Sequence, residues 1–367
     1  MRGSGAITAR GGSSTETENG AGSGGSVNIR ASGGELRWNA AVVASGGASG
    51  DSGGSGGSIS FSLNESYSPS NGERGSFITG SLQIAGNLIS EGGDASGSGG
   101  NGGQISINSN PYYFPHGQEV ALFGYTDVDS SGGQGSNTSG GTGGSINFYN
   151  RYSTIHDNVS GPGGGVVNYA KLTARGGNGS SGGRPGNASM STQDEYAFGV
   201  QNEQVLNFGD VDVSGGDASS STSTIWQGGY LSLSAMTHLE NHGRLISNGG
   251  TQSGGPSPSG AGGYISLQAW HGTLDNPGTI RANGGSATGA GRNGGYVELR
   301  GELVTSTGDV SANGGNSAAA GGSGGDLTFF STAGKTSVTG AATATGGNGT
   351  PKGTDGSIEI DGERVAP

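Results

Sequence analysis

The strongest constraint on the fold of this chain is a Gly-Gly pair that recurs ten times, each time behind a short apolar stretch. The first glycines of these pairs, at intervals of 30 to 46 residues, are Gly11, Gly46, Gly92, Gly132, Gly176, Gly215, Gly249, Gly284, Gly314 and Gly346. Gly and Pro supply 85 and 10 of the 367 residues, a share that would indicate disorder if the glycines had no period. Because they recur roughly every 20 to 50 residues, they indicate a stacked repeat structure instead.

The residues before each pair alternate like a strand with one buried face. Four residues before the pair the chain has Ile7, Val42, Leu88, Val128, Leu172, Val211, Leu245, Ile280, Val310 or Ala342. Two residues before the pair the side chain is small in nearly every copy, and the residue between these two columns varies freely. A period of two with one fixed face predicts a β-strand that buries this face.

Two further strands are expected in each copy. One follows a second Gly-Gly and has apolar residues two apart, as at Val27 and Ile29; the fifth copy is degenerate, with Ala188 and Met190. A weaker strand, such as residues 36–38, leads to the next copy. We therefore predict one all-β domain over residues 1–367, a right-handed parallel β-helix of about ten three-strand coils, since stacked coils share a narrow core. The coils start near residues 7, 42, 88, 128, 172, 211, 245, 280, 310 and 342.

Gly/Ser-rich excursions separate the first two strands of each copy. Their Gly-Gly-x pattern suits a polyproline-II backbone, which has three residues per turn. The excursions are either stacked as a column along one edge of the rod or flexible loops, and their similar length in most copies favours the column. The glycine pairs suit corners with positive φ. Asn248, Asn283 and Asn313 precede three successive pairs, where they suit the left-handed region or a hydrogen-bonded ladder.

Residues 239–247 and 274–282 carry a second, more specific pattern, Leu-x-Asn-x-Gly-x-apolar-x-small. It resembles the repeat of filamentous-haemagglutinin-type and autotransporter passenger β-helices. The resemblance implies a right-handed, secreted bacterial solenoid located at the cell surface.

Composition and charge narrow the classes of partner. The net charge of -12 argues against nucleic acid, because phosphate binding needs clustered Lys and Arg. Cys is absent, which excludes disulfides and thiolate metal sites. No apolar run is as long as a membrane span, and no signal peptide is visible.

Several motifs suggest chemistry, and each has a plainer explanation. Residues 50–54 read Gly-Asp-Ser-Gly-Gly, as around a serine-protease nucleophile, but within a Gly/Ser tract and without a partner His segment. Asp326 ends a stretch like a calcium-binding nonapeptide, but other copies have Ser, Gln or Tyr at this position. His238 and His242 have a spacing that binds zinc when it occurs on helices.

Acidic residues offer no better candidate for catalysis. Asp129 and Asp212 share the variable column before the pair, with Thr173 between them, and no paired-carboxylate motif recurs nearby. Asp210, Asp212 and Asp217 form the densest acidic cluster, which we expect to keep the rod soluble. We therefore predict no enzyme, no catalytic residues, no metal and no cofactor.

Aromatic residues are the candidates for contacts with a glycan or another partner. Tyr230, Tyr264 and Tyr296 take the same outward position in three successive copies, where their stacking either stabilises the sheet or offers a contact surface. The remaining candidates, in one of the insertions of copies two to five and elsewhere, are Tyr112, Tyr113, Phe114, Trp226 and Trp270.

The two ends suggest self-association. Neither end has an evident capping segment, and an uncapped solenoid exposes unpaired backbone groups and an apolar cross-section. The predicted end-to-end interface comprises Ile7, Ala9, Val27, Ile29, Ala342, Ala344, Ile358 and Ile360. The first functional hypothesis is an extracellular structural protein whose coils stack into a head-to-tail homopolymer. The alternative is an adhesin passenger that binds glycans or partner surfaces; an ice-binding column of Thr8, Thr173 and Thr343 is too irregular to compete.

Overall fold

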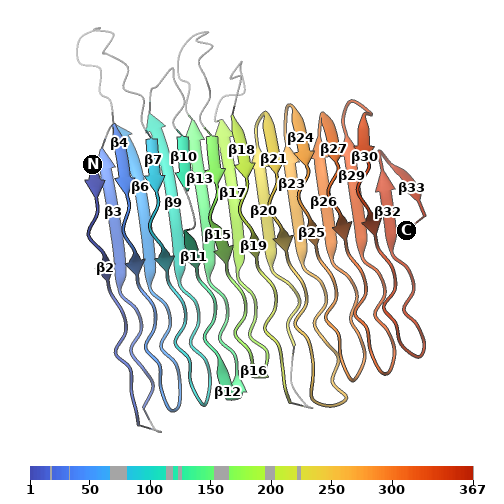
Figure 1. Ribbon diagram of the computed structural model, residues 1–367, viewed down its shortest axis with the longest axis horizontal. Coiled ribbons are helices and arrows are strands. Elements are labelled where there is room, and N and C mark those ends of the chain that lie inside the picture. Colours follow the sequence, from blue (N-terminus) through green and yellow to red (C-terminus); the bar gives the residue numbers. More distant parts are fainter. Residues whose placement is uncertain are drawn as a thin grey trace.

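The computed structural model describes residues 1–16, 19–32, 34–66, 81–112, 119–122, 126–152, 165–194, 203–220 and 225–366. These residues form ten stacked coils, and each coil contributes one strand to each of three long sheets (Figure 1). All pairings between successive coils are parallel, as from β3 (Ser26–Ser32) to β6 (Ser58–Ser66) and from β6 to β9 (Gln104–Tyr112). The predicted parallel β-helix is therefore confirmed.

Three long sheets and one short pair account for the strands. Sheet 1 contains β1 (Arg2–Gly3), β4 (Glu35–Trp38), β7 (Ser81–Ile84), β10 (Glu119–Leu122), β14 (Gly165–Asn168), β18 (Gln204–Asn207), β21 (His238–Asn241), β24 (Thr273–Asn276), β27 (Leu303–Ser306) and β30 (Thr336–Val338). Sheet 2 contains β2 (Ile7–Thr8), β5 (Val42–Val43), β8 (Leu88–Ile89), β11 (Asp127–Asp129), β15 (Lys171–Thr173), β19 (Val211–Asp212), β22 (Leu245–Ile246), β25 (Ile280–Arg281), β28 (Val310–Ser311) and β31 (Ala342–Thr343). Sheet 3 contains β3 (Ser26–Ser32), β6 (Ser58–Ser66), β9 (Gln104–Tyr112), β13 (Ser145–Tyr152), β17 (Asn187–Asp194), β20 (Tyr230–Ala235), β23 (Tyr264–Ala269), β26 (Tyr296–Gly301), β29 (Asp326–Ser331), β32 (Ser357–Ile360) and β33 (Glu363–Val365). A further pair, β12 (Gly135–Ser139) and β16 (Gly179–Ser181), lies in the excursions.

The core lies between the three sheets and consists of apolar columns in register. The alternation that predicts the strands holds, since Leu245 and Ile280 pair across adjacent coils of sheet 2 and are fully buried. In sheet 3 the predicted pairs Leu231 and Leu233 are buried in the same way. Each coil supplies only a few inward side chains, so burial depends on the coil above and the coil below.

A ladder of buried amides completes the core at the corner between sheets 1 and 2. The Nδ2 of Asn207 donates to Asn241 Oδ1 at 2.8 Å, and the Nδ2 of Asn241 donates to Asn276 Oδ1 at 2.7 Å. Asn168 and Ser306 extend the ladder at its two ends. Since a buried amide must be hydrogen-bonded, each coil fixes the side chain of its neighbour. Sequence reasoning missed this role, although the Leu-x-Asn-x-Gly pattern contains Asn241 and Asn276.

The Gly-rich excursions are ordered, as the stacked-column interpretation predicts. Each excursion has an outgoing arm and a returning arm, and in eight of the ten the described residues of the two arms are joined by two backbone hydrogen bonds three residues apart. In the second coil Gly54 N donates to Gly47 O at 2.9 Å and Gly57 N donates to Ala44 O at 2.6 Å. Three residues is one turn of polyproline II, so the arms of all coils form a bundle of extended chains, which hangs below the strands in Figure 1.

The glycine pairs are required for close packing and not for positive φ, so that expectation is wrong. Among the described residues, the glycines with positive φ are Gly34, Gly255, Gly334 and Gly362. A Cβ on Gly54 would instead lie 1.9 Å from the carbonyl oxygen of Gly22 in the preceding coil. The glycines are therefore determined by neighbouring backbone, which leaves no room for a side chain.

The expectation of an uncapped C-terminal end is wrong for sheet 3. Strand β33 turns back and pairs antiparallel with β32, with Ile358 opposite Val365. The turn consists of Asp361 and Gly362, with φ of 49° and 84°, as a two-residue hairpin of primed type requires. Asp361 also accepts hydrogen bonds from the backbone N–H of Ser331 and of Thr336. The edge next to the predicted interface residues Ile358 and Ile360 is therefore paired.

No helix in the described part of the chain is long and apolar enough to cross a membrane.

Candidate functional site

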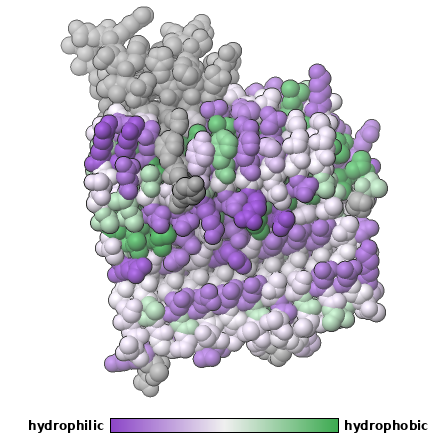
Figure 2. Space-filling view, in the orientation of Figure 1, coloured by the Kyte–Doolittle hydropathy of each residue, from purple (hydrophilic) through white to green (hydrophobic). Residues whose placement is uncertain are grey.

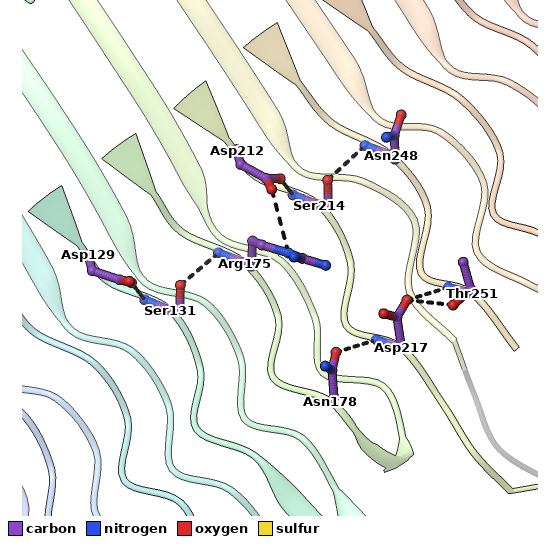
Figure 3. A network of polar contacts seen from close by, with 9 residues as sticks. All are labelled: Asp129, Ser131, Arg175, Asn178, Asp212, Ser214, Asp217, Asn248 and Thr251. Atoms are coloured by element: carbon purple, nitrogen blue, oxygen red, sulfur yellow. Dashed lines mark hydrogen bonds and ion pairs between the residues drawn. The ribbon is translucent and has the colours of Figure 1, made fainter. Parts of the chain in front are cut away.

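The outward face of sheet 2 and its outgoing arms carries a polar network that runs from coil to coil (Figure 3). Ser131 Oγ accepts a hydrogen bond from Arg175 N at 3.3 Å, and Ser214 Oγ accepts one from Asn248 N at 3.2 Å. The same column continues through Asn283, whose N–H donates to Asn248 Oδ1 at 2.9 Å. The predicted Asn ladder is confirmed in this form, in which side chains accept from backbone and no described Asn takes a positive φ.

The bond between the two arms explains why this network exists. Gly263 N donates to Ser247 O at 2.8 Å, and the other coils have the equivalent bond. In a regular parallel ladder Ser247 O would accept from the N–H of Asn283 in the next coil. Since that carbonyl is taken by the returning arm, a side-chain oxygen must accept from the displaced N–H. From the fourth coil to the tenth, the outward polar columns supply this acceptor.

Asp129 and Asp212 act within the same network, each as a hydrogen-bond acceptor for a backbone N–H of its own coil. Arg175 has no acceptor atom, so the N–H of Ser214 in the following coil donates to Asp212 Oδ1 at 2.9 Å. Asp129 Oδ1 accepts from Ser131 N in the same way, at 2.8 Å. Asp212 therefore supplies the acceptor that Arg175 lacks in the preceding coil. Asp129 makes the same bond, although the preceding coil has Glu91 at the equivalent position.

Glu91 is a described acidic side chain whose pKa is raised well above its usual range. It is half-buried, and this burial together with the nearby carboxylate of Asp129 raises the pKa of Glu91 to about 7. Asp94 adds to the repulsion, and Arg10 partly offsets it. Glu91 therefore stays protonated in mildly acidic solution.

The acidic cluster predicted around residue 210 is divided between separate contacts. Arg244 binds Asp210 through its Nε at 3.0 Å and holds the pKa of Asp210 below its usual range. Asp217 lies further along the chain, where its Oδ1 accepts from Thr251 N at 2.8 Å. Asp217 lines an open hollow in the glycine bundle together with short polar residues such as Asn178 and Ser219. Among the described residues that line that hollow, Asp217 is the one carboxylate.

His238, Glu240 and His242 lie on consecutive outward positions of the seventh coil. Glu240 Oε1 is 2.5 Å from His242 Nε2, while its Oε2 is 3.8 Å from His238 Nε2. The carboxylate thus lies between the two rings. Within the described ranges no group of three or more His, Asp or Glu side chains is arranged to hold a metal ion.

The Tyr column predicted from the sequence is a stack of parallel rings. The ring centroids of Tyr230 and Tyr264 are 5.2 Å apart, as are those of Tyr264 and Tyr296. Tyr264 Oη donates to Glu298 Oε2, and burial together with that carboxylate raises the pKa of Tyr264 to about 12. The inner ring faces are covered by neighbouring rings, so mainly edges and the open face of Tyr230 are left for a ligand.

The two candidate Trp residues are exposed and have separate partners. Trp226 is 40% exposed, and the guanidinium of Arg184 lies 5.7 Å from its ring centre. Trp270 is 51% exposed, and its Nε1 donates to Ser234 Oγ at 3.0 Å. Tyr112 ends β9, while Tyr113 and Phe114 lie outside the described residues.

A second aromatic stack, which sequence reasoning missed, lies at the corner between sheets 1 and 2. Phe208 stacks between Tyr169 and His242, with 4.8 Å between ring centroids on each side. Each of the three rings belongs to the residue that directly follows an Asn of the buried ladder. This common position after an Asn is the sequence signal that could have identified the stack.

Sheet 3 differs from the other two in having three outward columns that hold no charged residue over six coils. Strands β6, β9, β13, β17, β20 and β23 each place three side chains in columns that begin at Ser58, Ser60 and Ser62. We call these residues the neutral face: Ser58, Ser60, Ser62, Gln104, Ser106, Asn108, Ser145, Asn147, Tyr149, Asn187, Ser189, Ser191, Tyr230, Ser232, Ser234, Tyr264, Ser266 and Gln268. In the same coils the columns of sheet 2 carry Glu91, Asp129, Arg175 and Asp212. Hydrophilic residues also form bands along the long axis in Figure 2.

These features define a class of protein, a parallel β-helix joined along one side to a bundle of glycine-rich arms. No family model, curated protein or solved structure matches the chain. The solenoid that the resemblance implies is therefore present, while these comparisons do not support membership of the haemagglutinin or autotransporter families.

Proposed function

We propose that this chain is a non-enzymatic structural protein of the extracellular space or cell surface, a rigid solenoid that assembles end to end. Axial continuity carries the proposal: backbone hydrogen bonds link all ten coils through three sheets and the glycine bundle. The outward columns beside sheet 2 add further bonds in the same direction, so side chains that could serve catalysis are used for cohesion. The resemblance to passenger repeats supports the surface location.

Matching cross-sections support the end-to-end contact. Within the described residues β2 and β31 are the two edges of sheet 2. Ile7 and Ala342 are the two ends of one inward column that runs through all ten coils. Ala9 and Ala344 continue the small column. Since β33 covers β32, the contact would use sheets 1 and 2 and the glycine arms.

Gly12 allows a selective test of this contact. Gly47 is the equivalent residue in the next coil, and a Cβ added to Gly47 would lie only 2.2 Å from the carbonyl oxygen of Gly12. A Cβ added to Gly12 would have no atom within 4 Å, because Gly12 lies in the first of the described coils. A methyl group at Gly12 therefore leaves the monomer unchanged and clashes with an incoming glycine arm. The matched control is Gly20→Ala, since a Cβ there has its nearest contact at 3.5 Å.

Electron microscopy at micromolar concentration provides the measurement. We expect filaments with an axial repeat of roughly 48 Å from the wild type and from Gly20→Ala, and short rods from Gly12→Ala. Short rods from the wild type would overturn end-to-end assembly.

A glycan-binding adhesin is the second candidate, favoured by the exposure of Trp226, Tyr230 and Trp270. Exposed aromatic rings are costly in water and are typical of recognition surfaces. Glycan binding by single rods would favour this candidate over the structural one.

A further inference from the structure

The neutral face combines regular geometry with a single type of chemistry. Its strands lie about 4.8 Å apart, and successive outward residues of one strand are about 6.6 Å apart. All its side chains are hydroxyls, amides or phenols, in a chain whose net charge is -12. Sixteen of the eighteen are at least partly accessible, the exceptions being Ser62 and Ser266. The face is therefore a grid of uncharged donors and acceptors open to solvent.

Two aromatic rings border this grid along β20. Tyr230 is 47% exposed, and Trp270 is held against Ser234 by its Nε1 hydrogen bond. Tyr230, Ser232 and Ser234 face outward in alternation, so about 13 Å of hydroxyl-bearing strand separates the two aromatic sites. The hydrogen bond to Ser234 orients the indole before any ligand arrives, which lowers the entropic cost of binding.

We propose that the neutral face binds an extended, uncharged polysaccharide, with Trp270 and Tyr230 as its aromatic contacts. Sugar hydroxyls pair with the Ser, Asn and Gln side chains, and the apolar C–H face of a sugar ring packs on an aromatic ring. An uncharged face fits this partner because no ion has to be stripped of water without a counter-ion. A flat strand surface likewise fits a ribbon-like chain better than a compact ligand. This inference rests on the second candidate function.

Co-sedimentation with microcrystalline cellulose and with chitin tests the proposal. We expect the wild type to bind at least one of these polymers, and Trp270→Ala to weaken binding about fivefold. Ser232→Glu, which places a carboxylate between the two aromatic sites, is expected to weaken binding more than tenfold. Ser311→Glu is the matched control, since it adds the same charge to the outward column of sheet 2 and should bind as the wild type does.

Three outcomes would overturn the proposal. They are failure of the wild type to bind either polymer, equal effects of Ser232→Glu and Ser311→Glu, and unchanged binding by Trp270→Ala. Circular dichroism shows whether each variant is folded. If Ser232→Glu does not fold, Trp270→Ala still tests the proposal, because Trp270 is exposed and its replacement should not affect folding. Filament images from the same preparations separate this result from end-to-end assembly, which needs no polysaccharide.

Discussion

At the scale of single residues, the buried amides contribute to stability by satisfying one another. Asn241 accepts from Asn207 and donates to Asn276 and to Gly243 O. We expect Asn241→Ala to lower the free energy of unfolding by about 3 kcal/mol, because two buried amide groups lose a partner. Urea unfolding measures the effect. Asn248→Ala is the control, since it removes one acceptor at a partly exposed position and should cost about 1 kcal/mol; equal costs would contradict the ladder's role.

Glu91 gives the stability a pH dependence with a defined sign. Its pKa is about 7 when folded and about 4.5 when unfolded, so the folded state binds the extra proton between these values. The free energy of unfolding should therefore fall as the pH rises from about 4.5 to about 7. We expect a fall of only about 1 to 2 kcal/mol, because solvent screens a half-buried group. Urea midpoints across this range measure it. Glu91→Gln should remove most of this slope, and a variant with the wild-type slope would show that another group is responsible.

At the scale of elements, the two glycine arms of each coil pack so closely against the neighbouring coils that most of their glycines leave no room for a side chain. A Cβ on Gly141 would lie 1.8 Å from Gly100 O, so Gly141→Ala must displace the backbone of a neighbouring coil. We expect a loss of about 3 kcal/mol in urea unfolding. Gly20→Ala should change stability by less than about 1 kcal/mol. If both variants unfold alike, the arms are not packed as the backbone contacts indicate.

The elements also show which parts of the structure can be read from the sequence. The strands, the core columns and the ten coils follow from alternation, because each inward position repeats in the neighbouring coil. The packing of the glycine pairs could not be predicted, since Gly suits both a positive φ and a close approach of backbone. The carbonyl oxygen that leaves no room for a side chain belongs to another coil, so no local sequence pattern reveals it. The hairpin could have been predicted, because Asp361-Gly362 between strand-like residues is a strong turn signal.

The candidate sites were predictable to a different degree. The Tyr stack follows from one column, Tyr230, Tyr264 and Tyr296. The neutral face needs the register of six strands, which the sequence alone leaves uncertain where insertions change the spacing. The role of Asp212 depends on Arg175 in the preceding coil, and no local pattern reveals it.

At the scale of the whole molecule, each coil contacts only its neighbours, so the properties of the ends decide how far stacking extends. Strand β33 occupies the hydrogen-bonding edge of β32, which an incoming parallel strand would need. Deleting residues 362–367 removes this strand and keeps Asp361, whose carboxylate joins Ser331 and Thr336. We expect the deletion to open sheet 3 and to lengthen filaments several-fold, measured by light scattering and electron microscopy.

A double variant separates ordered stacking from aggregation at the opened edge. The same deletion combined with Gly12→Ala should remain as short rods, because the incoming coil would still meet the added methyl group in the glycine bundle. Filaments of unchanged length after the deletion would show that β33 does not limit growth. Irregular aggregates in both variants would show that the opened edge pairs without register, so that β33 protects a sticky edge and does not regulate a polymer.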